Sequence, residues 1–231
     1  MWRFALLWIA APLLAQQQSV DLVLVLDATP GMRPSLSAAA FRPQPEDRVA
    51  VLAFTSKSRL AQSFTNDPQK LKTAIEALGH RRIPFGISVV QSPEPATRLF
   101  RALLDAAQLF RLVPVAPGRQ RVIAAFFGTE DESSSPTPEE VKQALSDAQI
   151  TVYGIAVPRI DDRPASDPRL ETPPTLPGQV HPGTGPFAPL PEATMKRLAT
   201  FATVVRADPG SGTGNILDIL KRVRSTQSQT R

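Results

Sequence analysis

The sequence VDLVLVLD, residues Val20–Asp27, decides the fold class of this chain. Apart from its two Asp residues it consists only of Val and Leu. Such a short, nearly continuous apolar run is typical of a parallel strand that other elements cover on both faces. The run ends in Asp-Ala-Thr-Pro-Gly, residue types that favour a turn. We therefore expect a buried strand whose last residue, Asp27, lies at the start of a loop.

Further runs of this kind occur along the chain. Buried strands are predicted at residues 48–54 (RVAVLAF), 121–127 (RVIAAFF) and 150–157 (ITVYGIAV), with a short last strand at 204–206. Residues 58–65 (SRLAQSFT) follow the second strand too closely for a crossover helix. This strand should therefore pair antiparallel, at an edge of the sheet.

Helical patterns fill the intervals between the strands. Asp67 is expected to cap a helix that has Pro68 at its first position and ends at Gly79. The sequence TPEE, which begins at Thr137, is a capping box that opens another helix. Apolar residues at helical spacing predict further helices at residues 95–113, 190–201 and 215–223.

The alternation of strands and helices predicts an α/β fold, a Rossmann-like three-layer sandwich. The central sheet should be mostly parallel, with about six strands, one antiparallel edge strand and helices on both faces. Ligands of such sheets bind outside the carboxyl ends of the strands, where the strand order reverses. Three loops are expected to meet there, one after Asp27, one around Thr97 and one after residue 127.

Composition limits the classes of function. The chain has 231 residues, 42% of them hydrophobic, which suits one domain with a sizeable core. Its formal charge is +5, but Lys and Arg are scattered rather than gathered in a stripe with aromatic residues, so we expect no nucleic-acid binding. The absence of cysteine excludes disulfides, thiolate metal sites and cysteine nucleophiles.

The first residues predict export. Arg3 precedes an almost wholly apolar stretch at residues 4–14, and Ala15 is followed by three glutamines. This pattern is typical of a signal peptide, here residues 1–15, in an exported protein that is periplasmic or secreted. The alternative, an uncleaved membrane anchor, requires a longer apolar run, and no later stretch of the sequence could span a membrane.

The rest of the chain is expected to form one domain at residues 19–225, followed by a polar tail at 226–231. Residues 158–189 are rich in Pro and Gly and form an insertion or long surface loop rather than a second domain.

No catalytic pattern is present in the sequence. The two histidines, His80 and His181, lie in separate loops, and no nucleophile elbow occurs. The glycine-rich stretch at 210–214 lacks the spacing of a phosphate loop. We therefore expect no enzyme activity.

Several phrases of the sequence resemble von Willebrand factor type A domains, and they occur in that family's order. These are VDLVLVLDATPGM, DRVAVLAFTS, ATRLFRALLDAA, RVIAAFFGTEDESS and ITVYGIAV. The segment from Met195 onward, MKRLATFATVVRADPG, resembles the family's last helix–strand–helix unit. The likeness covers residues 19–225 apart from the Pro-rich insertion, and it is greatest to bacterial exported members.

The resemblance implies a metal-ion-dependent adhesion site that holds Mg²⁺ or Mn²⁺ and accepts an acidic group from a partner. Asp27 matches the first ligand, Thr29 stands where a Ser belongs, and Thr97 matches the Thr of the second loop. Gly31 and Gly128 stand where a Ser and an Asp are expected. The implied site is therefore degenerate, and because neutral hydroxyls repay little of a cation's dehydration, weak or absent metal binding is expected.

Two alternatives concern the acids of this region. Glu130 or Asp131 would substitute for the missing Asp if their loop folds inward, but the interpretation we favour is a solvated turn ahead of a helix. Without a metal, Asp27 would cap the turn that follows it through backbone N–H groups.

These observations predict an exported, non-enzymatic module of the adhesion type, which binds a protein partner through the loops at the carboxyl edge of the sheet. The alternative is a structural or assembly component of a cell-envelope complex that uses the faces of the domain instead.

Overall fold

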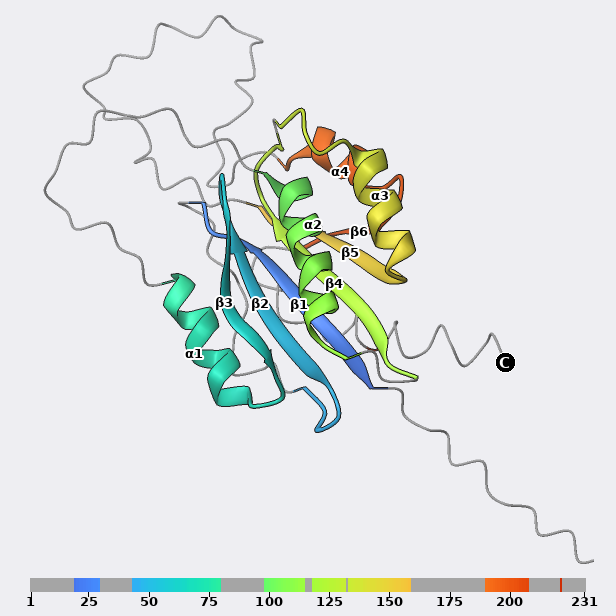
Figure 1. Cartoon of the computed structure of the whole chain (residues 1–231). Helices are drawn as coiled ribbons and strands as arrows, with labels where there is room; N and C mark the ends of the chain where they lie inside the picture. Colours follow the sequence, from blue (N-terminus) through green and yellow to red (C-terminus); the bar gives the residue numbers. More distant parts are fainter. Residues whose placement is uncertain are drawn as a thin grey trace, which may run out of the picture.

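The computed structural model describes residues 19–29, 43–79, 98–114, 118–131, 133–158, 190–207 and residue 221. These residues form one six-stranded sheet with helices packed against it (Figure 1). The strands are β1 (Val20–Asp27), β2 (Arg48–Phe54), β3 (Ser58–Thr65), β4 (Gln120–Phe127), β5 (Ile150–Ala156) and β6 (Thr203–Arg206). The helices are α1 (Pro68–Gly79), α2 (Leu99–Leu109), the 3₁₀ turn η1 (Phe110–Leu112), α3 (Pro138–Asp147) and α4 (Glu192–Leu198).

The strand order is β3-β2-β1-β4-β5-β6. All neighbouring strands pair parallel except β2 and β3, which are antiparallel, so β3 is the antiparallel edge strand. The order reverses at β1, because the chain continues to β2 on one side of it and later returns to β4 on the other. The carboxyl ends of β1 and β4 therefore flank the point at which ligands of such sheets bind.

The strand β1 is buried on both faces, as its sequence predicts. Leu22, Leu24 and Leu26 pack in the core layer that contains the apolar residues of α1. Val23 and Val25 pack in the opposite layer, with apolar residues of α2, α3 and α4. The three layers of the predicted sandwich are therefore present, with β1 at the centre (Figure 1).

Local sequence signals account for where several elements begin. The backbone N–H of Gln69 donates to Asp67, 2.9 Å away, so Asp67 caps α1 as expected. Thr137 and Glu140 form both hydrogen bonds of the predicted capping box at α3. The strands β1, β2 and β3 and the helix α1 have the predicted bounds.

Two helices are shorter than their patterns predicted. The α-helical part of α2 stops at Leu109 and continues as the 3₁₀ turn. The helix α4 is confined to Glu192–Leu198, because Pro191 is non-helical with a ψ of 74° and the chain tightens after Leu198. There the N–H of Phe201 donates to the carbonyl of Leu198, 3.1 Å away, in a three-residue step.

Several predictions concern residues outside those described: the signal peptide at 1–15, the polar tail at 226–231 and almost all of the insertion at 158–189. Of the helix predicted at 215–223, only Lys221 is described, and it is helical. Within the described ranges, no helix combines the length and the apolar character that a bilayer span requires.

Candidate functional site at the carboxyl ends of the strands

Asp27 is the last residue of β1 and is only 3% exposed. Its Oδ1 accepts hydrogen bonds from the backbone N–H and the hydroxyl of Thr29, at 2.9 and 2.5 Å. Thr29 is itself 3% exposed. Asp27 therefore caps the turn after β1, the role expected of a strand-end acid.

The other carboxylate oxygen of Asp27 links β1 to the loop after β4. Its Oδ2 accepts from the backbone N–H of Gly128 at 3.3 Å and from the hydroxyl of Thr129 at 3.0 Å. A carboxylate offers about four lone-pair sites, so these four donors saturate it. All four donors are neutral groups. In the described part of the chain, no cationic side chain contacts Asp27.

Sequence reasoning missed Thr129, which the structure brings against Asp27 across the switch point. The signal was available: Thr129 is the second residue after β4, and β4 pairs in parallel register with β1. The carboxyl ends of parallel neighbours meet at the same edge of a sheet, so a hydroxyl at that position faces the acid of the next strand.

These residues fit a divalent cation poorly. Mg²⁺ requires oxygen ligands in near-octahedral geometry and dehydrates reluctantly. Here a single carboxylate is already saturated, and both hydroxyls beside it donate their protons to it. Within residues 19–29, 43–79 and the other described ranges, no group of three or more acidic or histidine side chains gathers. Thr97 and Gly31 lie outside the described residues, so the metal ligand set stays a prediction.

The expectation that Glu130 and Asp131 form a solvated turn is wrong. Asp131 is only 5% exposed, and Glu130 is bound to the first turn of α4. The carboxylate of Glu130 accepts from the backbone N–H groups of Ala193 and Thr194, at 3.0 and 2.8 Å. The loop folds inward because these acids satisfy helix N–H groups that would otherwise have no partner.

Asp131 joins two helices at this edge of the sheet. Its Oδ2 accepts from the backbone N–H of Phe100 in α2, and its own N–H donates to the hydroxyl of Thr194 in α4, at 2.8 and 2.7 Å. Its Oδ1 accepts from the N–H of Ser133 at 2.8 Å. Arg197 of α4 donates to the Asp131 carbonyl and lies 4.4 Å from the ring centre of Phe100. The hydrogen bonds of Asp131 thus hold α2, α4 and its own loop together.

The β2–β3 turn completes this edge. The N–H of Ala28, next to Asp27, donates to the carbonyl of Phe54 at 2.8 Å. The N–H of Arg98, which directly precedes α2, donates to the carbonyl of Thr55 at 3.1 Å. The loop after β1, the β2–β3 turn, the start of α2 and the loop after β4 are therefore linked by hydrogen bonds into one surface, which we call the upper edge.

The opposite end of β1 carries a different arrangement. Asp21 is 3% exposed and accepts from Arg48 at 2.8 and 2.6 Å and from Arg119 at 2.9 Å. The hydrogen bonds that Arg48 donates to Asp21 raise the pKa of Arg48 above its ordinary value, against the opposing effect of burial. This cluster joins the starts of β1, β2 and β4.

The sheet order and the antiparallel edge strand define a Rossmann-like α/β domain. No protein-family model matches the sequence, and no curated protein matches it. The comparison with solved structures does find matches.

BatB from Bacteroides thetaiotaomicron is 16% identical and has a TM-score of 0.58, with 90% of this chain and 99% of that chain covered. An aerotolerance-related membrane protein from Bacteroides fragilis is 16% identical with a TM-score of 0.54, covering 88% and 99%. A von Willebrand factor type A protein from Catenulispora acidiphila is 14% identical with a TM-score of 0.54, covering 88% of this chain and 42% of that one. The chain has the fold of von Willebrand factor type A domains, as its sequence predicted.

Proposed function

We propose that this chain is an exported, non-enzymatic module that binds a protein partner through its upper edge, with weak or no dependence on a metal ion. The observation that carries the proposal is the saturation of Asp27 by four donors of its own chain. These hydrogen bonds tie the loop after β1 to the loop after β4. A surface ordered in advance loses little conformational entropy when a partner binds.

The state of the buried acids supports a non-enzymatic role. Asp27 and Asp131 accept hydrogen bonds from backbone N–H groups and hydroxyls, which hold the two loops in place. A general base must reach the proton that it abstracts, and a nucleophile needs a base beside it. Both carboxylates are instead occupied by structural donors.

Export is part of the proposal and rests on two observations. The N-terminal sequence has the charged and apolar segments of a signal peptide, followed by Ala15 at the expected cleavage position. One structure of the same fold belongs to a protein described as an aerotolerance-related membrane protein. Both observations favour a place in or near the cell envelope for this chain.

A pair of matched substitutions tests the position of the binding surface. Ser134, in the loop after β4, and Ser146, near the end of α3 and so at the opposite end of the sheet, are both exposed. The full-length protein, as wild type, Ser134→Arg or Ser146→Arg, would be immobilised and used to capture envelope proteins with and without EDTA. We expect Ser134→Arg to lose a captured partner that Ser146→Arg retains, with no effect of EDTA.

The alternative is an assembly component that binds through the faces of the domain. One feature is relevant to it: Leu112, at the end of η1, is 78% exposed and offers an apolar contact away from the upper edge. Loss of the partner from a Leu112→Ser variant, with full retention by Ser134→Arg, would replace the proposed function with this one.

A further inference from the structure

We propose that the upper edge recognises an acidic segment of its protein partner through three basic side chains, Lys57, Arg59 and Arg98, here called the basic rim. The inference rests on the proposed function and names the chemistry of the partner. It differs from recognition through a metal ion, because the positive charge comes from the side chains of the chain itself.

The three residues belong to one part of the upper edge. Lys57 is in the β2–β3 turn, where its carbonyl accepts from the N–H of Thr55 at 3.2 Å. Arg59 is the second residue of β3 and pairs with Ala53 of β2. Arg98 precedes α2, and its N–H donates to the carbonyl of Thr55. Thr55 follows Phe54, which pairs with Asp27, so the basic rim adjoins the candidate site.

No part of the described structure neutralises the basic rim. Lys57, Arg59 and Arg98 are all exposed. Among the described residues, none of the three forms an ion pair, a side-chain hydrogen bond or a contact with an aromatic ring. Several other arginines of the domain are engaged in this way, as Arg48 is with Asp21 and Arg197 with Phe100, although Arg111 is not engaged by any residue that the structure describes.

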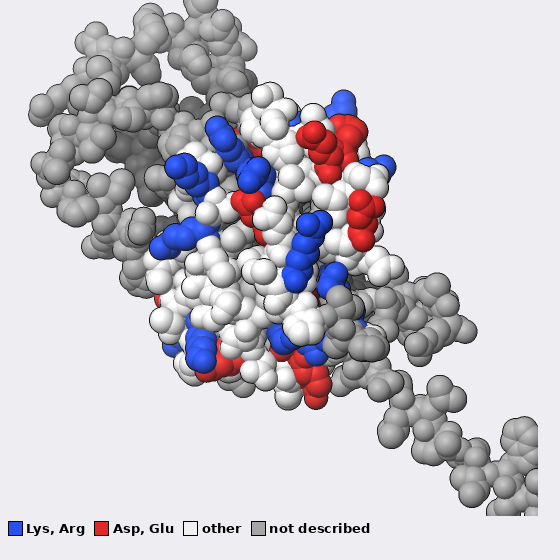
Figure 2. Space-filling view, viewed as in Figure 1, with Lys and Arg blue, Asp and Glu red and all other residues white. Residues whose placement is uncertain are grey.

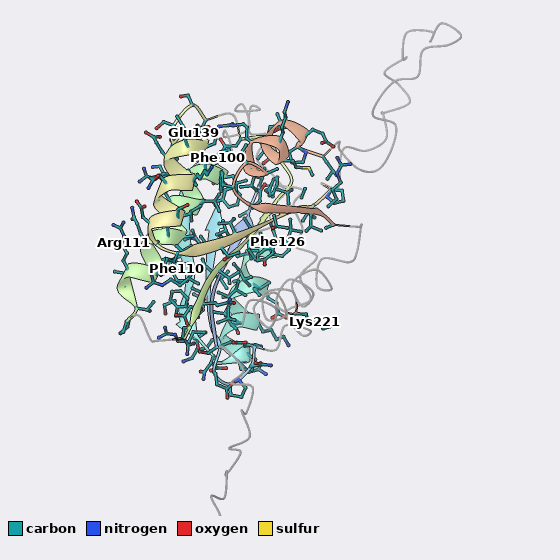
Figure 3. The ribbon with its side chains drawn as sticks, turned by 90° about the vertical axis from the view of Figure 1, so that its right-hand side faces the viewer. Phe100, Phe110, Arg111, Phe126, Glu139 and Lys221 are labelled. Atoms are coloured by element: carbon teal, nitrogen blue, oxygen red, sulfur yellow. The ribbon has the colours of Figure 1, made fainter. Side chains whose placement is uncertain are left out.

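Charge is distributed unevenly over this end of the molecule. Figure 2 shows blue side chains gathered at the upper left, over the region of β3 and the start of α2 in Figure 1. Red side chains are more numerous at the upper right, over α3 and α4, where some blue ones lie among them, and a red patch also lies just beneath the blue side chains at the upper left. The exposed acids of those helices include Glu139 and Glu140 of α3, whereas Glu192 of α4 is paired with Arg206. An acidic segment would therefore be attracted to the basic rim and repelled from α3, which fixes its orientation.

The chemistry of the basic rim fits carboxylates better than it fits nucleic acid or a lipid surface. The guanidinium group offers donors in a fork that matches a carboxylate with two parallel hydrogen bonds. Binding of single-stranded nucleic acid combines positive charge with exposed aromatic rings. In the described structure the ring of Phe100, the aromatic residue at the start of α2, is buried under Arg197. Recognition of anionic lipid requires about four to eight clustered basic residues.

A labelled octaglutamate peptide is a suitable probe for the full-length protein. Fluorescence anisotropy would follow its binding at about 50 mM salt and again at about 300 mM, where exposed charges are screened. The test variant combines Lys57→Gln, Arg59→Gln and Arg98→Gln. The matched control combines Lys70→Gln, Arg111→Gln and Lys142→Gln, which are exposed residues of α1, η1 and α3 and remove the same charge. Circular dichroism would confirm that both variants keep the fold.

We expect the test variant to weaken peptide binding about tenfold or more and the control variant to change it less than about twofold. Higher salt should weaken binding by the wild type and have little effect on the test variant. The inference is overturned if the peptide does not bind, if both variants weaken binding equally, or if duplex DNA or vesicles of phosphatidylserine bind more tightly than the peptide. In any of these cases, loss of a captured partner by Ser134→Arg alone would still support the proposed function.

Discussion

The two ends of β1 each bury an acid, and they satisfy it in opposite ways. At the start of the strand, Asp21 binds two arginines, whose side chains are 30% and 16% exposed. At its end, each carboxylate oxygen of Asp27 accepts from one backbone N–H group and one hydroxyl. No cationic group of the described residues binds it. Acids held by opposite charges stabilise a fold at the cost of removing those charges from water, whereas acids held by neutral dipoles shape a loop.

The comparison separates a structural end of the sheet from the end at which we propose that a partner binds. At the start of β1, Asp21 forms ion pairs with Arg48 and Arg119. At the upper edge, the charges of the basic rim are not used by the described residues, and Asp27 and Asp131 only order the loops. A binding surface requires groups that are held in place and still available to a partner, and the upper edge meets both requirements.

The largest effect is expected from Asp21→Asn. It should lower the free energy of unfolding by about 3 kcal/mol, because Arg48 and Arg119 would be left without the charge that compensates their partial burial. Urea denaturation measures this change. The control is Asp105→Asn, which removes the partly exposed ion pair with Arg101 within α2 and should cost about 0.5 kcal/mol or less. If Asp21→Asn costs as little as the control, the cluster of Asp21, Arg48 and Arg119 does not have the structural role that we assign to it.

Asp131→Asn should cost about 2 kcal/mol, because a carboxylate that accepts from Phe100 and Ser133 is replaced by an amide with only one accepting oxygen. The loss should be local to the upper edge. Hydrogen exchange should show faster exchange of the Phe100 amide while the amides of β1 keep their protection. The conservative control is Ser134→Ala, for which we expect no change in either. Uniformly faster exchange would show that Asp131 supports the whole domain instead.

At the carboxyl end of β1, the isosteric change Asp27→Asn should lower the free energy of unfolding by about 1.5 kcal/mol. One of the two pairs of donors that now bind the carboxylate would then face an amide N–H₂ group. Comparison with Asp21→Asn sharpens the contrast between the two ends. Salt should reduce the cost of Asp21→Asn, because screening weakens ion pairs, and should leave the cost of Asp27→Asn unchanged. Equal salt dependence of the two variants would remove the distinction that we draw between the ends.

How much the sequence could predict depends on the range over which each signal acts. The bounds of β1 follow from its own apolar run, and the start of α3 follows from the capping box of Thr137, three residues from its partner Glu140. These signals are local, since they lie within one strand or one turn of helix. Asp27 was likewise located from the turn that follows it, and that turn is present.

The wrong predictions concern contacts that are distant in the sequence. Glu130 and Asp131 look like a solvated turn when only their neighbours are considered. The donors to Glu130 lie in α4, where Thr194 is 64 residues away, and Asp131 accepts from Phe100 of α2, 31 residues away. Thr129 reaches Asp27 across 102 residues. A pattern in one segment carries no information about the free N–H groups that another helix presents, so the fold has to be known before such acids can be assigned a role.

The central claim is that Asp27 orders the upper edge without a cation. Isothermal titration of the full-length protein with Mn²⁺ and with Mg²⁺, together with the same titration of Asp27→Asn, tests it most directly. We predict little heat in either protein and a melting temperature that EDTA does not change. A Kd below about 100 µM for the wild type that Asp27→Asn abolishes would contradict the claim and restore a working metal site.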